Sequence, residues 1–256
     1  MKYATYRTWA AIVVCVVVTL CALPAAASKA ATSATISPTL APDRLGGEAA
    51  LTVAVNFTTG GFGVPAPLRE SALWLPAGLS LNLPILRSCS AARLQTLGAR
   101  GCPRESKIGE GHARLEAYVG SLTIDEDASM SLFLGAPRNL TPTFELLGQG
   151  YTPIDERIVS TGTVVYTNAP YGEELVTPIP AIPTLALEPD ASIVALSLTV
   201  GARTASHRRR GNAIIVASSC PRGGFPFAGE FSYTDGSSGN TTATIPCPPQ
   251  TTTKRG

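Results

Sequence analysis

Alternation of apolar and polar residues with a period of two is the feature that most restricts how this chain can fold. In the run Leu51–Phe57 every second residue is apolar, and Ile158–Tyr166 alternates in the same way. A period of two is typical of β-strands that bury one face. Further strand-like runs recur about every 8–12 residues, with 24 glycines and 21 prolines to form the turns between them. We therefore predict an all-β fold, an antiparallel β-sandwich of jelly-roll-like type. The expected strands are 34–37, 51–57, 68–75, 79–83, 112–118, 121–125, 129–134, 142–147, 158–166, 193–200, 213–218, 227–233 and 241–245.

No linker-like stretch divides these strands. We expect one β-sandwich domain over residues 28–248, with two fused sub-sandwiches that meet near residues 134–142 as the alternative. The segment Thr177–Pro183 has proline at three of seven positions, so it should be extended without forming a central strand. Asp235-Gly236 predicts a turn between the last two strands.

The stretch Cys89–Gly111 interrupts the strand pattern and predicts one short helix near residues 90–97. Good helix formers fill this part of the chain, either Ser88 or Ser90 can cap its start, and Gly98 suits its end. Gly109 and Gly111 suggest a bulge or tight turn that leads into the next strand.

The N-terminus has the layout of a secretory signal peptide over residues 1–27. Lys2 and Arg7 precede an uncharged apolar run, and three alanines at 25–27 offer a cleavage site. An uncleaved membrane anchor is the alternative, but Pro24 and the alanine pattern favour cleavage and an extracellular location. The polar tail 249–256 is expected to be disordered.

Charge argues against nucleic acid as a partner. Without residues 1–27, which hold two basic and no acidic residues, the chain carries 18 of its 20 basic residues and all 18 acidic ones. A neutral chain lacks the electrostatic footprint of a nucleic-acid-binding protein. The one basic run, His207–Arg210, is interpreted as a solvated hairpin loop, with an anionic surface partner as the alternative.

Four cysteines remain after the signal peptide: Cys89, Cys102, Cys220 and Cys247. An even number in an exported chain predicts disulfide bonds, with three connectivities open. The most local one pairs Cys89 with Cys102 and Cys220 with Cys247. Their spacing is not that of a zinc site, and we expect neither a metal nor a cofactor.

Two blocks of sequence resemble a group of secreted actinobacterial proteins of unassigned function. The first is the run Leu75–Pro84 followed by Cys89, Leu94 and the pattern Cys102-Pro-x-x-Ser-x-Ile-Gly-x-Gly111. The second is the C-terminal pattern Phe231-x-Tyr-x-Asp-Gly…Pro-Cys247. The resemblance implies export and a β-rich fold, and it carries no catalytic residue.

Nothing in the sequence has the pattern of a nucleophilic active site. The chain has two histidines, His112 and His207, and no Gly-x-Ser-x-Gly elbow. Three acidic clusters could supply the carboxylate pair of a glycosidase. They are 125–127, 155–156 and 173–174. Since each falls at a turn or strand end, solvated carboxylates are the simpler interpretation.

We therefore expect a secreted, non-enzymatic protein that acts by binding or as a structural component at the cell surface. The alternative is a secreted carbohydrate-active hydrolase with paired carboxylates. Tyr151, Tyr166 and Tyr171 lie near strand ends and are the candidate binding residues for a cell-surface polymer or glycan, because tyrosine offers contact area and a polar hydroxyl. We expect no membrane span once the signal peptide is removed.

Overall fold

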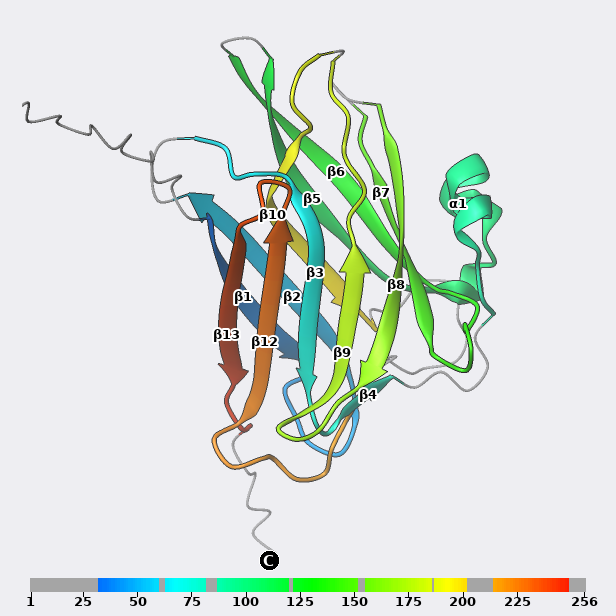
Figure 1. Cartoon of the computed structure of the whole chain (residues 1–256). Coiled ribbons are helices and arrows are strands. Elements are labelled where there is room, and N and C mark those ends of the chain that lie inside the picture. Colours follow the sequence, from blue (N-terminus) through cyan, green and yellow to red (C-terminus); the bar gives the residue numbers. More distant parts are fainter. Residues whose placement is uncertain are drawn as a thin grey trace, which may run out of the picture.

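The structure is a computed structural model that describes residues 32–59, 63–81, 87–119, 122–151, 155–185, 187–201 and 214–248. Its dominant feature is one large antiparallel β-sheet (Figure 1). The predicted signal peptide 1–27, the basic run His207–Arg210 and the tail 249–256 lie outside the described residues.

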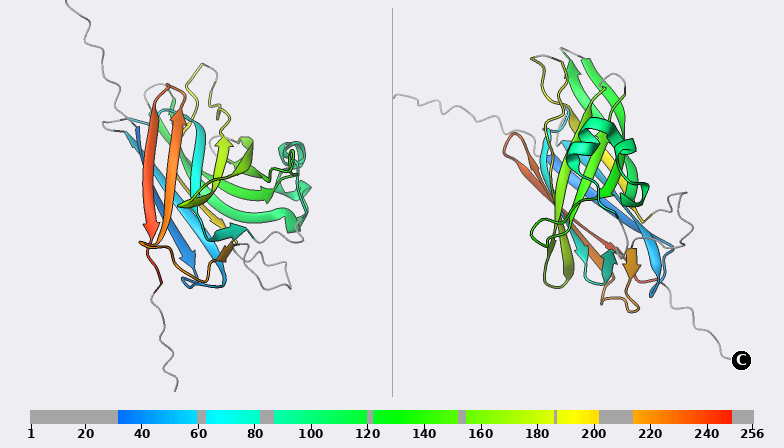
Figure 2. Two further views of the ribbon diagram at one scale, coloured as in Figure 1. Left: turned by 60° about the horizontal axis from the view of Figure 1, so that its bottom comes forward. Right: turned by 90° about the vertical axis from the view of Figure 1, so that its right-hand side faces the viewer.

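The described strands form a single 13-stranded sheet in the order β13-β12-β3-β9-β8-β7-β6-β5-β10-β2-β11-β4, with β1 paired to β2. The strands are β1 Thr32–Ala41, β2 Glu48–Thr59, β3 Leu68–Pro76, β4 Leu79–Leu81, β5 Lys107–Val119, β6 Leu122–Leu134, β7 Thr143–Gln149, β8 Arg157–Tyr166, β9 Tyr171–Pro178, β10 Ser192–Val200, β11 Ile214–Val216, β12 Phe225–Tyr233 and β13 Ser238–Ile245. The all-β antiparallel prediction is confirmed. The predicted sandwich or jelly roll is not shown, because the strands curl as one sheet into a half-barrel (Figure 2).

The curl brings the two ends of the sheet together. β1 lies against β13, although no ladder of hydrogen bonds between them is recorded among the described residues. Inside the curl, the ring of Phe57 on β2 meets the ring of Phe231 on β12 edge to face, with centroids 5.0 Å apart. A large right-handed sheet twist, together with apolar side chains on one face, favours this closure because it removes that face from water.

The concave face buries most of the apolar side chains. Strands β1, β2, β3, β12 and β13 contribute the largest cluster, which includes Phe57, Phe231 and Tyr233. A second cluster joins β5 to β8 and contains Phe144, whose ring packs over Gly162 on the neighbouring strand. The alternation seen in the sequence therefore separates an apolar interior from a mostly polar exterior.

The predicted helix is confirmed as α1 Ala91–Leu97, followed by the 3₁₀ turns η1 Gly98–Gly101 and η2 Arg104–Ser106. α1 lies against the convex face of the sheet, over β7 and β8 (Figure 2). Leu94 is fully buried there against Phe133 and Leu147. Ser90 occupies the N-cap position, but its side chain makes no capping hydrogen bond, so that part of the prediction is wrong.

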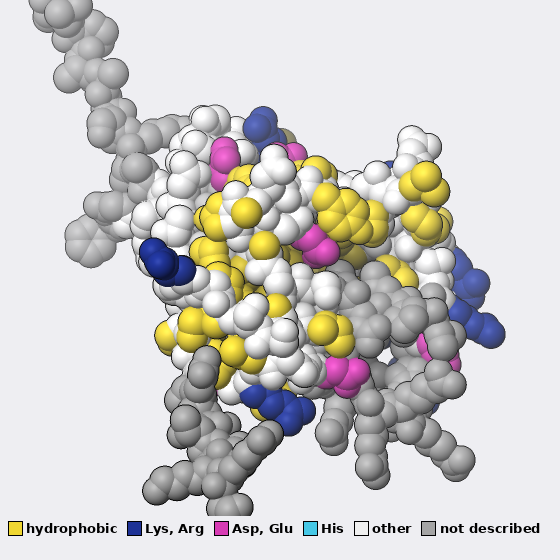
Figure 3. Space-filling view, turned by 90° about the horizontal axis from the view of Figure 1, so that it is seen from below, with side chains coloured by type: hydrophobic (Ala, Val, Ile, Leu, Met, Phe, Trp, Pro, Cys, Tyr) yellow, Lys and Arg dark blue, Asp and Glu magenta, His cyan; other side chains and the backbone are white. Residues whose placement is uncertain are grey.

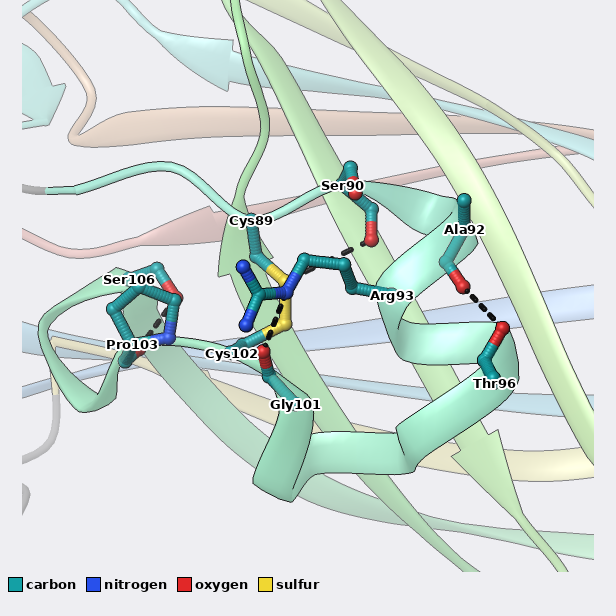
Figure 4. Close-up of a disulfide and its surroundings, with 9 residues drawn as sticks. All are labelled: Cys89, Ser90, Ala92, Arg93, Thr96, Gly101, Cys102, Pro103 and Ser106. Atoms are coloured by element: carbon teal, nitrogen blue, oxygen red, sulfur yellow. Dashed lines mark hydrogen bonds between the residues drawn. A yellow bond between two sulfur atoms is a disulfide. The ribbon is translucent and has the colours of Figure 1, made fainter.

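Both disulfides follow the most local of the three predicted connectivities. Cys89–Cys102, with Cα atoms 5.4 Å apart, fastens α1 to the sheet, and its cysteines are only 3% and 9% exposed. The surrounding loop is held by hydrogen bonds, among them one from Arg93 Nε to the Gly101 carbonyl at 2.8 Å (Figure 4). Cys220–Cys247 links the turn before β12 to the end of β13, and Cys247 is exposed.

Four strand predictions differ from the structure. The predicted strands 121–125 and 129–134 are one continuous strand, β6. β1 continues through Pro38 to Ala41, because an edge strand can accommodate a residue without an N–H donor. β5 begins at Lys107 and not at His112, with a shift in register between Lys107 and Gly109 where a bulge was expected. β9 Tyr171–Pro178 was not predicted.

Candidate functional site

A cavity opens on the concave face of the sheet. Its walls come from β5, β6, β7, β8 and β10, and the segment 179–182 crosses over it. The volume of the cavity is about 70 Å³. A single water needs about 10–15 Å³ by this measure, and an engineered apolar cavity of about 150 Å³ holds benzene. The space therefore admits a small apolar group, such as the end of an alkyl chain, and it is open to solvent on one side.

The segment 179–182, called the strap here, exists because β9 and β10 are not neighbours. Four strands separate them in the sheet, so the connection must cross the concave face. Pro180 within the strap and Pro178 and Pro183 on either side lack N–H donors and fix the backbone, which prevents the strap from pairing as a strand. The predicted extended segment 177–183 is thus confirmed for residues 179–183. It is wrong for Thr177 and Pro178, which pair with β3 as the last residues of β9, a strand between β3 and β8.

Hydrogen bonds anchor the strap at both ends. The Ile179 N–H donates to the Arg69 carbonyl of β3 at 2.7 Å, and the Ala191 N–H donates to the Ile182 carbonyl at 2.8 Å. The Ser160 hydroxyl, on β8, donates to the Pro178 carbonyl. The strap is thus fixed above the sheet at a distance that leaves the cavity beneath it.

The cavity wall is apolar with three polar exceptions: Glu126 on β6, Glu156 just before β8, and Ser160. Glu126 is 3% exposed, and its Oε1 accepts a hydrogen bond from the Tyr151 backbone N–H at 3.0 Å. Glu156 is exposed at the rim. Two carboxylates from different predicted acidic clusters therefore meet at one apolar cavity, an arrangement that only the strand order could reveal.

Gly148 on β7 forms an open part of the wall. A Cβ atom built on Gly148 would find Ile158 O as its nearest neighbour, 3.9 Å away, and this distance is an ordinary van der Waals contact. By contrast, a Cβ on Gly162, also on the concave face, would overlap the Phe144 ring. Gly148 therefore faces empty space, and a larger side chain there would enter the cavity without a clash.

The three candidate tyrosines do not gather at one site. Tyr151, 64% exposed, follows β7, and its hydroxyl is 3.4 Å from Ser129 Oγ, on the face of β6 opposite the cavity-lining Ala128 and Met130. Tyr166, 71% exposed, ends β8, so the length of that strand separates it from Tyr151. Tyr171 begins β9 beside Tyr166 and is half-buried. None of these three side chains is among the described residues that line the cavity.

Seen from below in Figure 3, the described hydrophobic side chains form small groups between other residues, and the described charged side chains are scattered. His112 is exposed on β5 and points to the face opposite that of its cavity-lining neighbour Ala113.

Two further glutamates are buried away from the cavity. On the convex face, burial raises the pKa of Glu145, and this outweighs the lowering effects of the Thr161 hydroxyl bond (2.6 Å), Arg138 and the Ala91 backbone bond. Glu145 thereby connects the sheet to the start of α1. On β9, burial alone raises the pKa of Glu173, whose Oε2 has no hydrogen-bond partner among the described residues.

The described residues contain neither a candidate metal site nor a candidate transmembrane helix. Within these ranges, no group of three or more His, Cys, Asp or Glu side chains is arranged to hold a metal ion. The same ranges also contain no helix with the length and hydropathy needed to cross a bilayer.

Comparison of the chain with protein-family models, with curated proteins and with solved structures finds no match. The resemblance to secreted actinobacterial proteins therefore stays a prediction, and the functional argument rests on the cavity alone.

Sequence reasoning placed Glu126 and Glu156 in acidic clusters but missed the cavity that they share. The one available signal was the closely spaced prolines of the run 177–183, which disfavour a paired strand and so favour an unpaired crossing of the sheet, as observed over residues 179–182. Which strands it crosses depends on pairings between residues far apart in the chain, and these leave no local pattern.

Proposed function

We propose that the protein is a secreted, non-enzymatic binding protein that takes the apolar part of a small amphipathic molecule into the cavity beneath the strap. The observation that carries this proposal is the apolar wall with a few polar groups at its rim. Binding sites for small molecules have this composition, because apolar burial supplies affinity and a few polar groups orient the ligand.

Export supports this role. The two disulfides are typical of an oxidising compartment, and the signal-peptide pattern of residues 1–27 points the same way. Apolar packing between β1 and β13 and two disulfides hold the half-barrel in one conformation. Little conformational entropy is therefore lost when a ligand binds.

The cavity favours a small apolar ligand over the flat glycan platform considered from the sequence. A glycan platform requires several aromatic side chains on one face, whereas Tyr151 is separated from Tyr166 and Tyr171. A cell-surface polymer with a lipid-like branch remains compatible with the cavity, since that branch would present an alkyl chain.

The test measures binding of 1-octanol to the purified protein, expressed from the full chain. Isothermal calorimetry gives the affinity, and thermal unfolding gives the stabilisation by the ligand. At ten times its Kd, octanol is expected to raise the free energy of unfolding by about 1.4 kcal/mol through mass action. Gly148→Leu should abolish this effect while the variant remains folded, because the new side chain occupies the cavity.

His112→Leu is the matched control, since it adds apolar bulk on the opposite face of the wall strand β5. It should leave octanol binding unchanged. Binding that survives Gly148→Leu, or no binding of octanol to the unaltered protein, would contradict the proposed function.

The second candidate is the carbohydrate-active hydrolase, which is favoured by the meeting of Glu126 and Glu156 at one cavity. Glycosidases use such a pair as acid and as nucleophile or base. Against this candidate, the wall offers few hydroxyl or amide groups to bind a sugar. Turnover of nitrophenyl glycosides that is lost in Glu126→Gln would establish this candidate in place of the binding role.

A further inference from the structure

We infer that the molecule bound beneath the strap is a cationic amphiphile, with a narrow alkyl chain in the cavity and a positively charged headgroup at Glu126 and Glu156. This inference rests on the proposed function and adds the chemical class of the ligand. It is carried by two independent observations, the apolar wall of an open cavity and the sign of the charges on that wall.

The apolar wall determines the buried part of the ligand. Apart from Glu126, Glu156 and Ser160, the described residues of the wall are apolar or glycine. About 70 Å³ is enough for the end of an alkyl chain, which would lie between the strap and the sheet. Because the cavity is open to solvent at its rim, the other end of such a molecule stays outside or at the rim.

The negative charge of the cavity wall favours a cationic headgroup. Among the described residues of the cavity wall, Glu126 and Glu156 are the ionisable ones, and these described residues include no lysine, arginine or histidine. Glu126 is buried within an apolar surface, where a nearby cation interacts more strongly than it would in water. An anionic headgroup at the same place would meet two carboxylates of its own sign.

The nearest arginine with assigned contacts is turned away from the cavity. Arg157 follows Glu156, but its guanidinium lies on the convex face and donates to the Gln95 carbonyl at 2.9 Å and to Gln149 Oε1 at 3.1 Å. Its positive charge therefore lies beside the C-terminal end of α1 and not in the cavity. Asp155, on the other side of Glu156, accepts from Nε2 of the same Gln149 at 3.3 Å and is not among the described residues of the cavity wall.

The experiment compares three ligands with the same chain and different headgroups: octylammonium, 1-octanol and octanoate, each titrated calorimetrically into the protein at pH 7. We expect octylammonium to bind about ten times more tightly than octanoate, with octanol between them. In the double variant Glu126→Gln and Glu156→Gln, the three affinities should converge to within about twofold. Glutamine keeps the oxygen that accepts the Tyr151 N–H.

Asp127→Asn is the matched control. Asp127 is the neighbour of Glu126 on β6 and is exposed on the opposite face, so its loss should leave the preference for octylammonium intact.

The outcomes separate the two claims. If none of the three ligands binds, the proposed function itself is refuted, and the ligand class with it. If all three bind equally and Gly148→Leu abolishes their binding, the cavity is a binding site but the cationic class is wrong. A preference for octylammonium that persists in the double glutamine variant also overturns the inference, because the charge would then come from elsewhere.

Discussion

The contact between Phe57 and Phe231 gives the most direct test of the curl, because these rings lie on strands far apart in the order of the sheet. β2 and β12 are separated by seven strands along the path of hydrogen-bonded neighbours. In a flat sheet the two rings could not meet. In the half-barrel they are 3% and 1% exposed and cross at 89° with centroids 5.0 Å apart.

The perturbation is a double-mutant cycle of Phe57→Leu and Phe231→Leu. Each single substitution should lower the free energy of unfolding by about 1–3 kcal/mol, as core substitutions commonly do. Edge-to-face pairs at this separation contribute about 0.5–1.5 kcal/mol beyond burial. The double variant should therefore be less destabilised than the sum of the singles by about that amount. Phe57 also meets the ring of Tyr233 at 6.4 Å, and this contact cancels in the cycle because Tyr233 is unchanged.

The assay is chemical unfolding in urea with both disulfides intact, followed by circular dichroism. Phe57→Leu combined with Leu94→Ala provides the control, since Leu94 lies on the convex face beneath α1. These two changes should add within about 0.5 kcal/mol. If the coupling between Phe57 and Phe231 is no larger than that of this control pair, the rings do not touch and the curled arrangement is wrong.

Three further predictions concern buried groups. Burial and the nearby Asp235 raise the pKa of Tyr233 to about 12. As the unfolded chain would release this proton near pH 10, the protein should lose stability between pH 10 and 12, by about 1.4 kcal/mol per unit; Tyr233→Phe should remove this loss in unfolding curves measured against pH. Gly162→Val should destabilise the fold by about 1–3 kcal/mol through overlap with Phe144, and Phe144→Ala in the same chain should recover part of the loss in urea unfolding. Glu173→Gln should stabilise the protein at neutral pH by about 1 kcal/mol, because burial raises the pKa of Glu173 and its charged form therefore opposes folding. This gain should shrink as the pH falls from the raised pKa of Glu173 to the pKa of an unfolded glutamate, and an equal gain at acidic pH would refute burial as the cause.

Local patterns were sufficient to predict most of the strands. Alternation in Leu51–Phe57 places its apolar residues in the interior, as observed in β2. The turn at Asp235-Gly236 forms as expected, with Asp235 Oδ1 accepting the Ser237 N–H at 3.0 Å. Helix α1 was also predictable, because a run of good helix formers ends at a glycine with positive φ. In each case the deciding interactions lie within a few residues of one another.

Strand β9 and the cavity required information that is not local. Gly172, Glu173 and Glu174 have low β-propensity, and they form a strand because β3 and β8 supply backbone partners on both sides. The curl depends likewise on packing between the two ends of the chain, and a sandwich would satisfy the same alternation. The shared position of Glu126 and Glu156 follows from the pairing of β6, β7 and β8, which no acidic cluster reveals by itself.

The unequal burial of the two crosslinks determines the order in which a reductant can open them. An attacking thiolate must reach a sulfur atom. Cys247 is exposed, whereas Cys89 and Cys102 are covered by α1 and the sheet beneath it. Mild reducing agents should thus reduce Cys220–Cys247 first and release the C-terminal end of β13. The product would keep the Cys89–Cys102 disulfide and helix α1. The covered bridge would open only after α1 separates from the sheet, so its reduction rate would report how often that separation occurs.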